Sequence, residues 1–153
     1  MSRHYQGRFM PNIPQKYKGD PTNIIYRSSW ELKFLMECDK NQNIIEYQSE
    51  EVIVPYRSPL DDKIHRYFPD FVIKIKGNDD KIRTVMIEIK PYNQTIPPKP
   101  PKKGRPTKRL INEIATYGVN QAKWNAAEEY CKDRLWSFKV MTEHELFVGG
   151  KTP

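Results

Sequence analysis

The chain has few of the residues that build disulfide scaffolds and structural zinc sites. Its 153 residues include only two cysteines and three histidines. Cys38 and Cys131 lie far apart in the sequence and show no metal-ligand spacing, and the histidines are scattered. This pattern disfavours a structural zinc site. We interpret both cysteines as small buried hydrophobic residues in a reducing compartment.

Long apolar runs are also missing. No segment approaches the roughly 20 apolar residues that a membrane-spanning helix needs. The first eight residues, MSRHYQGR, are followed by no apolar stretch, so we expect no secretory signal and no secretion. We accordingly expect no membrane partner.

What is present fits one globular domain with an anionic partner. Hydrophobic residues make up 37% of the chain and aromatic residues 12%, too much for a wholly disordered protein. Lysine and arginine outnumber the acids by 26 to 19, giving a net charge of +7. A basic balance points most often to nucleic acid, although the charge is a weak signal by itself.

Two segments are basic and lack hydrophobic periodicity. Residues 1–22 hold three prolines and four basic residues against one acid, which predicts an irregular basic N-terminal arm that orders on a partner. We assign residues 23–153 to a single domain. Within it, residues 91–107 form a predicted Pro/Lys-rich extended loop, since six of the sixteen residues from 91 to 106 are proline.

Hydrophobic patterning predicts a mixed α+β fold, with helices packed on a mixed sheet. The first helix spans 28–39, where Ser28 and Glu31 have capping-box spacing. Strands at 44–56 (continuous or interrupted near Ser49), 66–76 and 82–90 indicate an antiparallel meander. The remaining predicted elements are helices at 108–117 and 119–132 separated at Gly118, a strand at 135–141, and a short helix opened by Thr142 and Glu145.

Two acids and a lysine meet at one end of the second hairpin. The turn Gly77–Asp80 is centred so that Asp70 lies opposite Glu88 in an antiparallel pair. Opposed residues have side chains about 5 Å apart on one face. Lys90 is two residues beyond Glu88 and therefore points the same way.

The opposite face of this hairpin, formed by the alternate residues of both strands, supports the register. It is uniformly apolar and is predicted to face the core, whereas the acidic side is mixed in character. The predicted core face carries Phe71, Ile73, Ile75, Val85, Ile87 and Ile89, and the mixed face carries Val72, Lys74, Thr84 and Met86.

This constellation is sufficient for phosphodiester hydrolysis. Adjacent carboxylates repel unless something neutralises them, and hard oxygen ligands suit Mg²⁺. The ion polarises a phosphoryl oxygen, and a neighbouring lysine positions water or offsets transition-state charge. The alternative is a solvated face, because an isolated acid-x-lysine on a strand is common. The matched second acid, Asp70, favours catalysis.

Pro69-Asp70 followed by Glu88-Ile89-Lys90 resembles the PD-(D/E)XK nuclease superfamily, whose core has α-β-β-β-α-β order. Longer stretches resemble a narrower family, the head completion nucleases of T4-like tailed phages; they lie at 14–34, 47–59, 65–71 and 87–91. The resemblance implies a Mg²⁺-dependent DNA endonuclease, with Mn²⁺ as a substitute, that acts in head completion and DNA packaging. The resemblance also implies catalytic roles for Asp70, Glu88 and Lys90.

The resemblance also adds more distant candidates. In many superfamily members an acid on the first helix points to the metal, which makes Glu31 a candidate catalytic residue and metal ligand; the alternative is that it only completes the capping box. Gln121 matches a glutamine that reaches the site or the DNA in some branches, and its alternative is a solvated helix position. Arg27 and Arg66 are candidate phosphate contacts. Glu50 and Glu51 are interpreted as solvated strand or loop acids rather than metal ligands. His65 is interpreted as a turn histidine, and its alternative is a DNA contact.

Six basic residues within eleven positions are predicted to bind DNA without reading its sequence. They are Lys99, Lys102, Lys103, Arg105, Lys108 and Arg109, with no acid among them. The alternatives are a role in solubility or contact with an acidic protein surface.

The leading hypothesis is therefore a metal-dependent endonuclease of low sequence specificity. The main alternative is a non-catalytic DNA-binding component of the virion head or neck. An RNA- or ribosome-associated protein would explain the charge but not the matched acids. The family resemblance implies phage head, portal or neck proteins as partners, and action in the host cytoplasm during assembly or in association with the virion. We expect no nucleotide cofactor.

Overall fold

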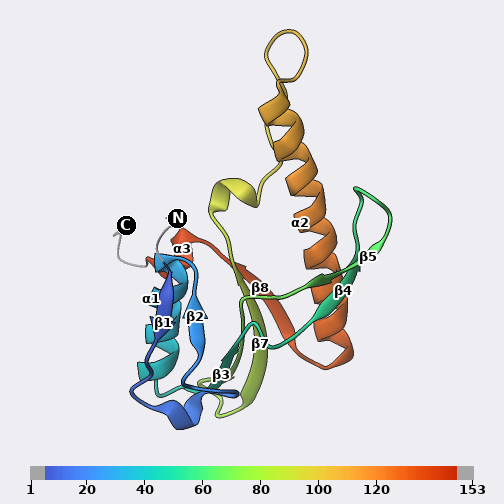
Figure 1. The fold of residues 1–153 in the computed structure, drawn as a ribbon. Coiled ribbons are helices and arrows are strands. Elements are labelled where there is room, and N and C mark those ends of the chain that lie inside the picture. The colour runs from blue at the N-terminus through green and yellow to red at the C-terminus, as the bar shows by residue number, and fades with distance from the viewer. Residues whose placement is uncertain (1–5, 148–153) are drawn as a thin grey trace.

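A four-stranded sheet lies between two helices in the computed structural model, which describes residues 6–147 (Figure 1). The strand order is β3-β6-β7-β8, and β3, β6 and β7 are antiparallel whereas β8 joins β7 in parallel. The strands are β3 (Ile44–Ser49), β6 (Phe71–Lys76), β7 (Ile82–Ile89) and β8 (Ser137–Met141). The predicted meander and mixed α+β class are confirmed.

Helix α1 (Ser29–Lys40) covers one face of the sheet. It begins after Ser28, whose Oγ accepts the backbone N–H of Glu31 at 3.1 Å, as an N-cap should. The apolar face of α1 is buried against the apolar face of the sheet. The residues in this contact are Trp30, Phe34, Leu35 and Cys38 from α1, and Phe71, Ile73, Ile87 and Ile89 from β6 and β7.

Helix α2 (Lys108–Asp133) covers the other face and is continuous, so the predicted break at Gly118 is wrong. Its C-terminal half buries Trp124, Ala127 and Cys131 against Val72 and Met86. The face of the hairpin that we predicted to be mixed is therefore a second core where α2 covers it. On this face of the hairpin, the part near Lys74 and Thr84 is not covered by α2.

Two predicted strands are each divided. The first ends at Ser49, because Glu50 adopts a left-handed conformation with φ 56°. The prediction of one strand over 66–76 is wrong. It splits before β6, where Pro69 lacks the N–H that a ladder needs. The part of the first predicted strand that follows Ser49 and the part of the second that precedes Pro69 form a separate hairpin. It consists of β4 (Val54–Arg57) paired with β5 (Ile64–Tyr67).

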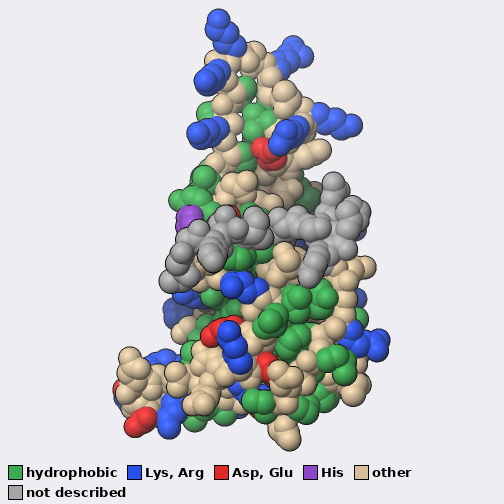
Figure 2. Space-filling view, turned by 90° about the vertical axis from the view of Figure 1, so that its left-hand side faces the viewer, with side chains coloured by type: hydrophobic (Ala, Val, Ile, Leu, Met, Phe, Trp, Pro, Cys, Tyr) green, Lys and Arg blue, Asp and Glu red, His purple; other side chains and the backbone are tan. Residues whose placement is uncertain are grey.

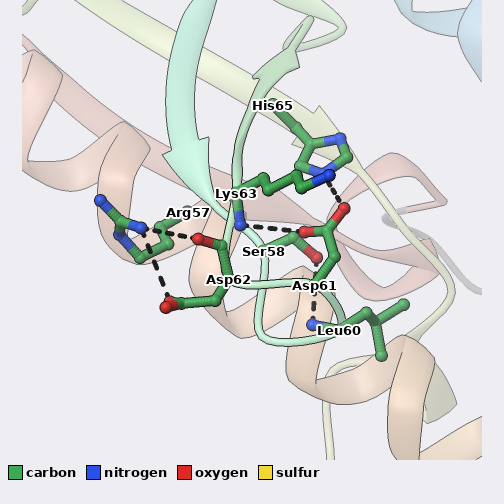
Figure 3. A network of polar contacts seen from close by, with 7 residues as sticks. All are labelled: Arg57, Ser58, Leu60, Asp61, Asp62, Lys63 and His65. Atoms are coloured by element: carbon green, nitrogen blue, oxygen red, sulfur yellow. Dashed lines mark hydrogen bonds and ion pairs between the residues drawn. The ribbon is translucent and has the colours of Figure 1, made fainter.

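Polar contacts stabilise the turn of this hairpin (Figure 3). His65 Nε2 lies 2.7 Å from Asp61 Oδ2, and Asp61 Oδ1 accepts the backbone N–H of Lys63 at 3.0 Å. Arg57 donates to the backbone carbonyl of Asp62 at 2.7 Å. His65 therefore takes part in a local structural network, but it lies in strand β5 and not, as we interpreted it, in the turn itself.

The N-terminal segment packs on the domain, so the prediction of an irregular arm is wrong for residues 6–22. Strand β1 (Gly7–Phe9) pairs with β2 (Ile24–Tyr26), and a 3₁₀ turn, η1 (Pro14–Lys16), lies between them. Phe9 and Tyr17 enter the core around α1. Residues 1–5 lie outside the described part of the chain, and the division at residue 22 stays a prediction.

A projection rises from the body of the molecule (Figure 1). It consists of the loop 91–107, which contains the 3₁₀ turn η2 (Tyr92–Gln94), and the first half of α2, residues 108–119; we call it the α2 projection. Every residue from 99 to 109 is exposed. The chain continues through β8 to α3 (Glu143–Leu146), where Thr142 and Glu145 form the predicted capping box. No helix in the described residues has both the length and the apolar character to cross a membrane.

Candidate active site

Two carboxylates are apposed where β6 begins and β7 ends. Phe71 pairs with Ile87 and Val72 with Met86, and the same register one residue further places Asp70 opposite Glu88, as predicted. Glu88 is only 6% exposed. The Asp70 carboxylate turns inward and accepts the backbone N–H of Ile89 at 2.8 Å, which fixes its position against β7.

Burial and charge both act on this acidic pair. Desolvation by burial raises the pKa of Asp70 well above its usual value, and the neighbouring carboxylate of Glu88 raises it further. The charge of Glu31 adds in the same direction, while the hydrogen bond from Ile89 opposes them. The protein therefore holds two acids together in a position where their negative charge is poorly compensated.

Lys90 lies beside the pair, on the side expected from strand alternation. Its Nζ is 4.0 Å from Glu88 Oε2, and its side chain is 24% exposed. The backbone N–H of Lys90 donates to the carbonyl of Met141 at 2.9 Å, extending the ladder between β7 and β8. The ammonium group is thus anchored by the strand and remains accessible from solvent.

Glu31 lies at the start of α1, near the acidic pair. Its Oε2 accepts the backbone N–H of Arg27 at 3.0 Å, one residue before the N-cap Ser28, so it supports the helix start without forming the expected capping box with Ser28. Burial raises its pKa, and the charges of Glu50 and Glu88 add to the effect. It therefore lies within the electrostatic field of the acidic pair.

The described residues contain no group of three or more His, Cys, Asp or Glu side chains arranged to hold one ion. Asp70 and Glu88 are brought together by the sheet, whereas Glu31 approaches them from α1 without completing a three-acid cluster. Its role as a third ligand stays a prediction.

Arg27 and Glu50 form an ion pair at the edge of the site. Glu50, which we interpreted as a solvated loop acid, is instead half-buried, and its backbone N–H donates to the Asp70 carbonyl at 3.1 Å. The interaction with Glu50 raises the pKa of the Arg27 guanidinium, and the charges of Glu31 and Asp70 add to this. Sequence reasoning missed Glu50 because only its left-handed backbone turns the chain toward Asp70.

Tyr67 and Trp124 were also missed as site residues. The Tyr67 hydroxyl and the Trp124 indole N–H are buried, and the Tyr67 hydroxyl lies within hydrogen-bonding reach of Glu88 and Trp124. Burial and then the charge of Glu88 raise the pKa of Tyr67, which places its hydroxyl beside that carboxylate. Lys123 Nζ lies 5.6 Å from the centre of the Tyr67 ring. No sequence signal distinguished these aromatic residues from ordinary core residues.

The predicted DNA contacts occupy several places. Arg66 lies exposed on β5, 5.8 Å from the centre of the Phe68 ring, and Gln121 is partly buried on α2. The six basic residues of 99–109 gather around the tip of the α2 projection, away from the acidic pair (Figure 2). None of these roles is tested by the fold alone, and each stays a prediction.

The donor set fits a hard divalent cation. Mg²⁺ takes one or two protein carboxylates and keeps several waters, so Asp70 and Glu88 suffice for it. Oxygen-only ligands do not favour soft transition metals. The buried hydroxyl of Tyr67 lies beside Glu88 at the same place.

The elements α1, β3, β6, β7, α2 and β8 follow the order α-β-β-β-α-β and carry the acidic pair with its lysine. This fold and site define a nuclease domain of the restriction-endonuclease-like class. Residues 41–143 match the family described as TnsA-like endonuclease N terminal, and the chain belongs to this family. The matched residues include Asp70, Glu88 and Lys90 but not Glu31.

A full-length relative shows the same relationship over nearly the whole chain. The head completion nuclease of Enterobacteria phage T4 is 40% identical over 144 residues, which cover 93% of each protein. The resemblance to head completion nucleases and the predicted nuclease function are thus confirmed, and the matched region extends beyond the family's 41–143.

Proposed function

We propose that the chain is a Mg²⁺-dependent PD-(D/E)XK endonuclease that hydrolyses DNA phosphodiester bonds with little sequence specificity. The observation that carries this proposal is the apposition of Asp70 and Glu88 in a partly desolvated position with Lys90 beside them. Two like charges are costly to hold together there, and a divalent cation removes that cost.

Each residue of the site has a distinct role in this proposal. Asp70 and Glu88 hold Mg²⁺, for which Mn²⁺ substitutes, and Glu31 assists from α1. The bound cation supplies Lewis-acid polarisation of a phosphoryl oxygen. The hydrogen bond from Ile89 keeps Asp70 in place, so that little reorganisation is needed on binding.

Lys90 orients the attacking water and offsets the negative charge that develops on the phosphate. Its ammonium group has three donors, and the 4.0 Å separation from Glu88 keeps it at the acidic pair. Tyr67 and Trp124 provide two further donors beside Glu88. They hold the orientation of its carboxylate or of a water between them.

Phosphate contacts outside the centre bind the substrate. Arg27, Arg66 and Gln121 lie on the elements around the site, and the tip of the α2 projection carries six more basic residues. Lysine and arginine contacts to phosphates position DNA but carry no direct sequence information. Low sequence specificity follows from this arrangement.

The biological setting is proposed from the relative. The name of the relative, a head completion nuclease, supports a role of the activity in phage head completion. Head, portal or neck proteins are then the expected partners. The expected place of action is the host cytoplasm during assembly, or the virion itself.

The test is cleavage of supercoiled and linear plasmid DNA by the full chain with Mg²⁺, with Mn²⁺, and with EDTA. We expect cutting with either metal and none with EDTA. Lys90→Ala should lower the rate at least about a hundredfold, because it removes the group that positions water and offsets charge. Lys76→Ala, an exposed lysine at the far end of β6, is the matched control and should cut like the wild type.

Cleavage that persists in EDTA would contradict the metal requirement. Equal activity of the Lys90→Ala and wild-type proteins would remove Lys90 from the site. Absence of cutting by folded protein that still binds DNA would favour a structural DNA-binding role.

A further inference from the structure

Helix α2 connects the acidic pair with the basic tip. In its C-terminal half, Trp124 packs beside Tyr67, whose hydroxyl lies next to Glu88. At the other end, the helix begins at Lys108. Sixteen residues at a rise of 1.5 Å each separate Lys108 from Trp124, so the helix spans about 24 Å between them. The second limb of the α2 projection leaves β7 directly after Lys90 and rises beside the helix (Figure 1).

The tip has exposed positive charge with little compensation. All residues from 99 to 109 are exposed, and Gly104 makes the turn with φ 77°, a conformation that suits glycine. Nothing lies within 4 Å of a Cβ at this position. Of the six basic residues, Arg109 pairs with Glu113 at 3.1 Å, and no other ion pair joins the tip to an acid among the described residues.

A groove runs along the α2 projection. It has a volume of about 980 Å³ and lies between the loop and the first half of α2. Its polar lining includes Asn93, Gln94, Asn112, Thr116 and Asn120. Lys99, Lys108 and Arg109 line its tip end, and Asn120 lies one helical turn from Trp124. The groove therefore carries hydrogen-bonding groups along the path from the basic tip towards the acidic pair.

We propose that the α2 projection is a second DNA contact, whose tip lies beyond Lys108 and therefore more than about 24 Å along the helix axis from Trp124, which packs near the acidic pair. Successive phosphates of one strand are spaced about 3.4 Å along a duplex. For a duplex that runs along α2, the contact therefore lies at least about seven base pairs from the bond that is cut. This inference rests on the proposed function, since it takes DNA as the substrate.

Charge and shape together favour a nucleic acid backbone at this place. A protruding tip with uncompensated lysines and arginines suits a regular array of phosphates, and the amides of the groove donate to the same oxygens. An acidic protein surface is the alternative occupant. The two differ in a measurable way, because only DNA binding depends on the length of the duplex.

The test measures the affinity of the full-length Asp70→Asn protein in EDTA for DNA hairpins with stems of 5, 8, 11, 14 and 20 base pairs. We expect affinity to rise about tenfold between the 5- and 11-base-pair stems, where the tip comes within reach. A triple variant, with Lys102, Lys103 and Arg105 each changed to alanine, should lose this rise. Its plot of log affinity against log salt should be less steep by up to about three, because up to three phosphate contacts are removed.

The matched control removes the same charge at the opposite end of the sheet. It changes Lys76, Lys81 and Arg83, in and beside the turn between β6 and β7, to alanine. The control should keep both the length dependence and the salt slope. If the tip variant also keeps both, the proposed contact is wrong and an acidic protein partner becomes the better occupant.

The two proposals fail in different ways. Wild-type protein that cuts no DNA with Mg²⁺, yet binds long hairpins through the tip, would contradict the nuclease function and support the contact. Normal cleavage by the wild type, together with DNA binding that depends neither on stem length nor on the tip residues, would support the nuclease function and contradict the contact.

Discussion

At the residue scale, Asp70 and Glu88 show an opposition between stability and function. Burial and the charge of Glu88 both raise the pKa of Asp70, so the ionised form of Asp70 is destabilised in the folded protein. Nothing in the core requires this, because the neighbouring positions Phe71 and Ile87 are buried and apolar. Unfavourable local choices of this kind concentrate at functional sites.

Asp70→Asn should therefore raise the stability of the protein at neutral pH without metal. The amide oxygen can still accept the N–H of Ile89, while the like-charge repulsion disappears. In a domain of this size each kcal/mol gained raises the melting temperature by about 2–4 °C, and we expect a gain of several degrees. Thermal unfolding in EDTA measures it.

The gain should depend on pH with a defined sign. The pKa of Asp70 is raised on folding, so the penalty begins where the unfolded carboxyl ionises, above the ordinary value of 3.8, and reaches its full size above the folded pKa. It should fade as the pH falls towards the ordinary value of 3.8, where the group is protonated in both states. Asp79→Asn is the control, because pairing with Arg83 lowers the pKa of Asp79 to about 2. An equal gain in both variants would contradict this account.

The two cysteines carry a second prediction at this scale. Burial raises the pKa of Cys131 to about 11, and it also raises the pKa of Cys38. Few thiolates then form near neutral pH, and both thiols are free and buried. A maleimide should label native protein far more slowly than protein unfolded in guanidinium. Rapid labelling of both thiols in the native state would show that they are accessible.

At the element scale, α2 has two halves with different tasks. The C-terminal half packs Trp124, Ala127 and Cys131 on the sheet, whereas Ile111 and Ile114 in the first half are exposed. The sequence placed Leu110, Ile114 and Tyr117 on one helical face, but that face extends beyond the sheet and finds no comparable core. The helix is held by its second half and carries the projection with its first.

Gly118→Ala should stabilise the protein by about 0.5–1 kcal/mol, because glycine is a poor residue for a helix interior. The new Cβ would meet Pro59 Cγ at 3.9 Å, an ordinary contact distance. Urea unfolding of the variant measures the change. A continuous helix does not require glycine at position 118. A loss of stability in the variant would therefore contradict this account of α2.

Several elements could be predicted because their signals are local. The first helix had both a cap and a periodic face, and the centre of the Gly77–Asp80 turn determined the register of Asp70 against Glu88. The split between β5 and β6 and the separate β4–β5 hairpin could not be predicted in this way. They depend on which strand pairs with which, and β-branched residues around Val54 suit either sheet.

Glu50, Tyr67 and Trp124 could not be predicted as part of the site for a related reason. The left-handed backbone of Glu50 brings it beside Asp70, and helix α2 must fold over the sheet before Trp124 meets Tyr67. Neither arrangement has a pattern within a short window of sequence. By contrast, Asp70, Glu88 and Lys90 belong to one hairpin, and strand alternation puts them on the same face of it.

At the scale of the whole molecule, both faces of the sheet are covered, which leaves the strand ends as the place for polar chemistry. The acidic pair lies at such an end, beside the base of the α2 projection (Figure 1). The N-terminal segment contributes to the same compact body through Phe9 and Tyr17. Its prolines and basic residues suggested an irregular arm, because a few buried aromatic residues leave no periodic signal.

The central claim is that the apposed acids form a metal-dependent nuclease centre. The most direct test is plasmid cleavage with Mg²⁺ by Asp70→Asn, beside the wild type and Asp79→Asn, with folding checked by thermal unfolding. The account predicts that Asp70→Asn is folded and at least as stable, yet cuts at least about a hundredfold more slowly, while Asp79→Asn cuts normally. Wild-type cleavage rates from a folded Asp70→Asn protein would contradict it.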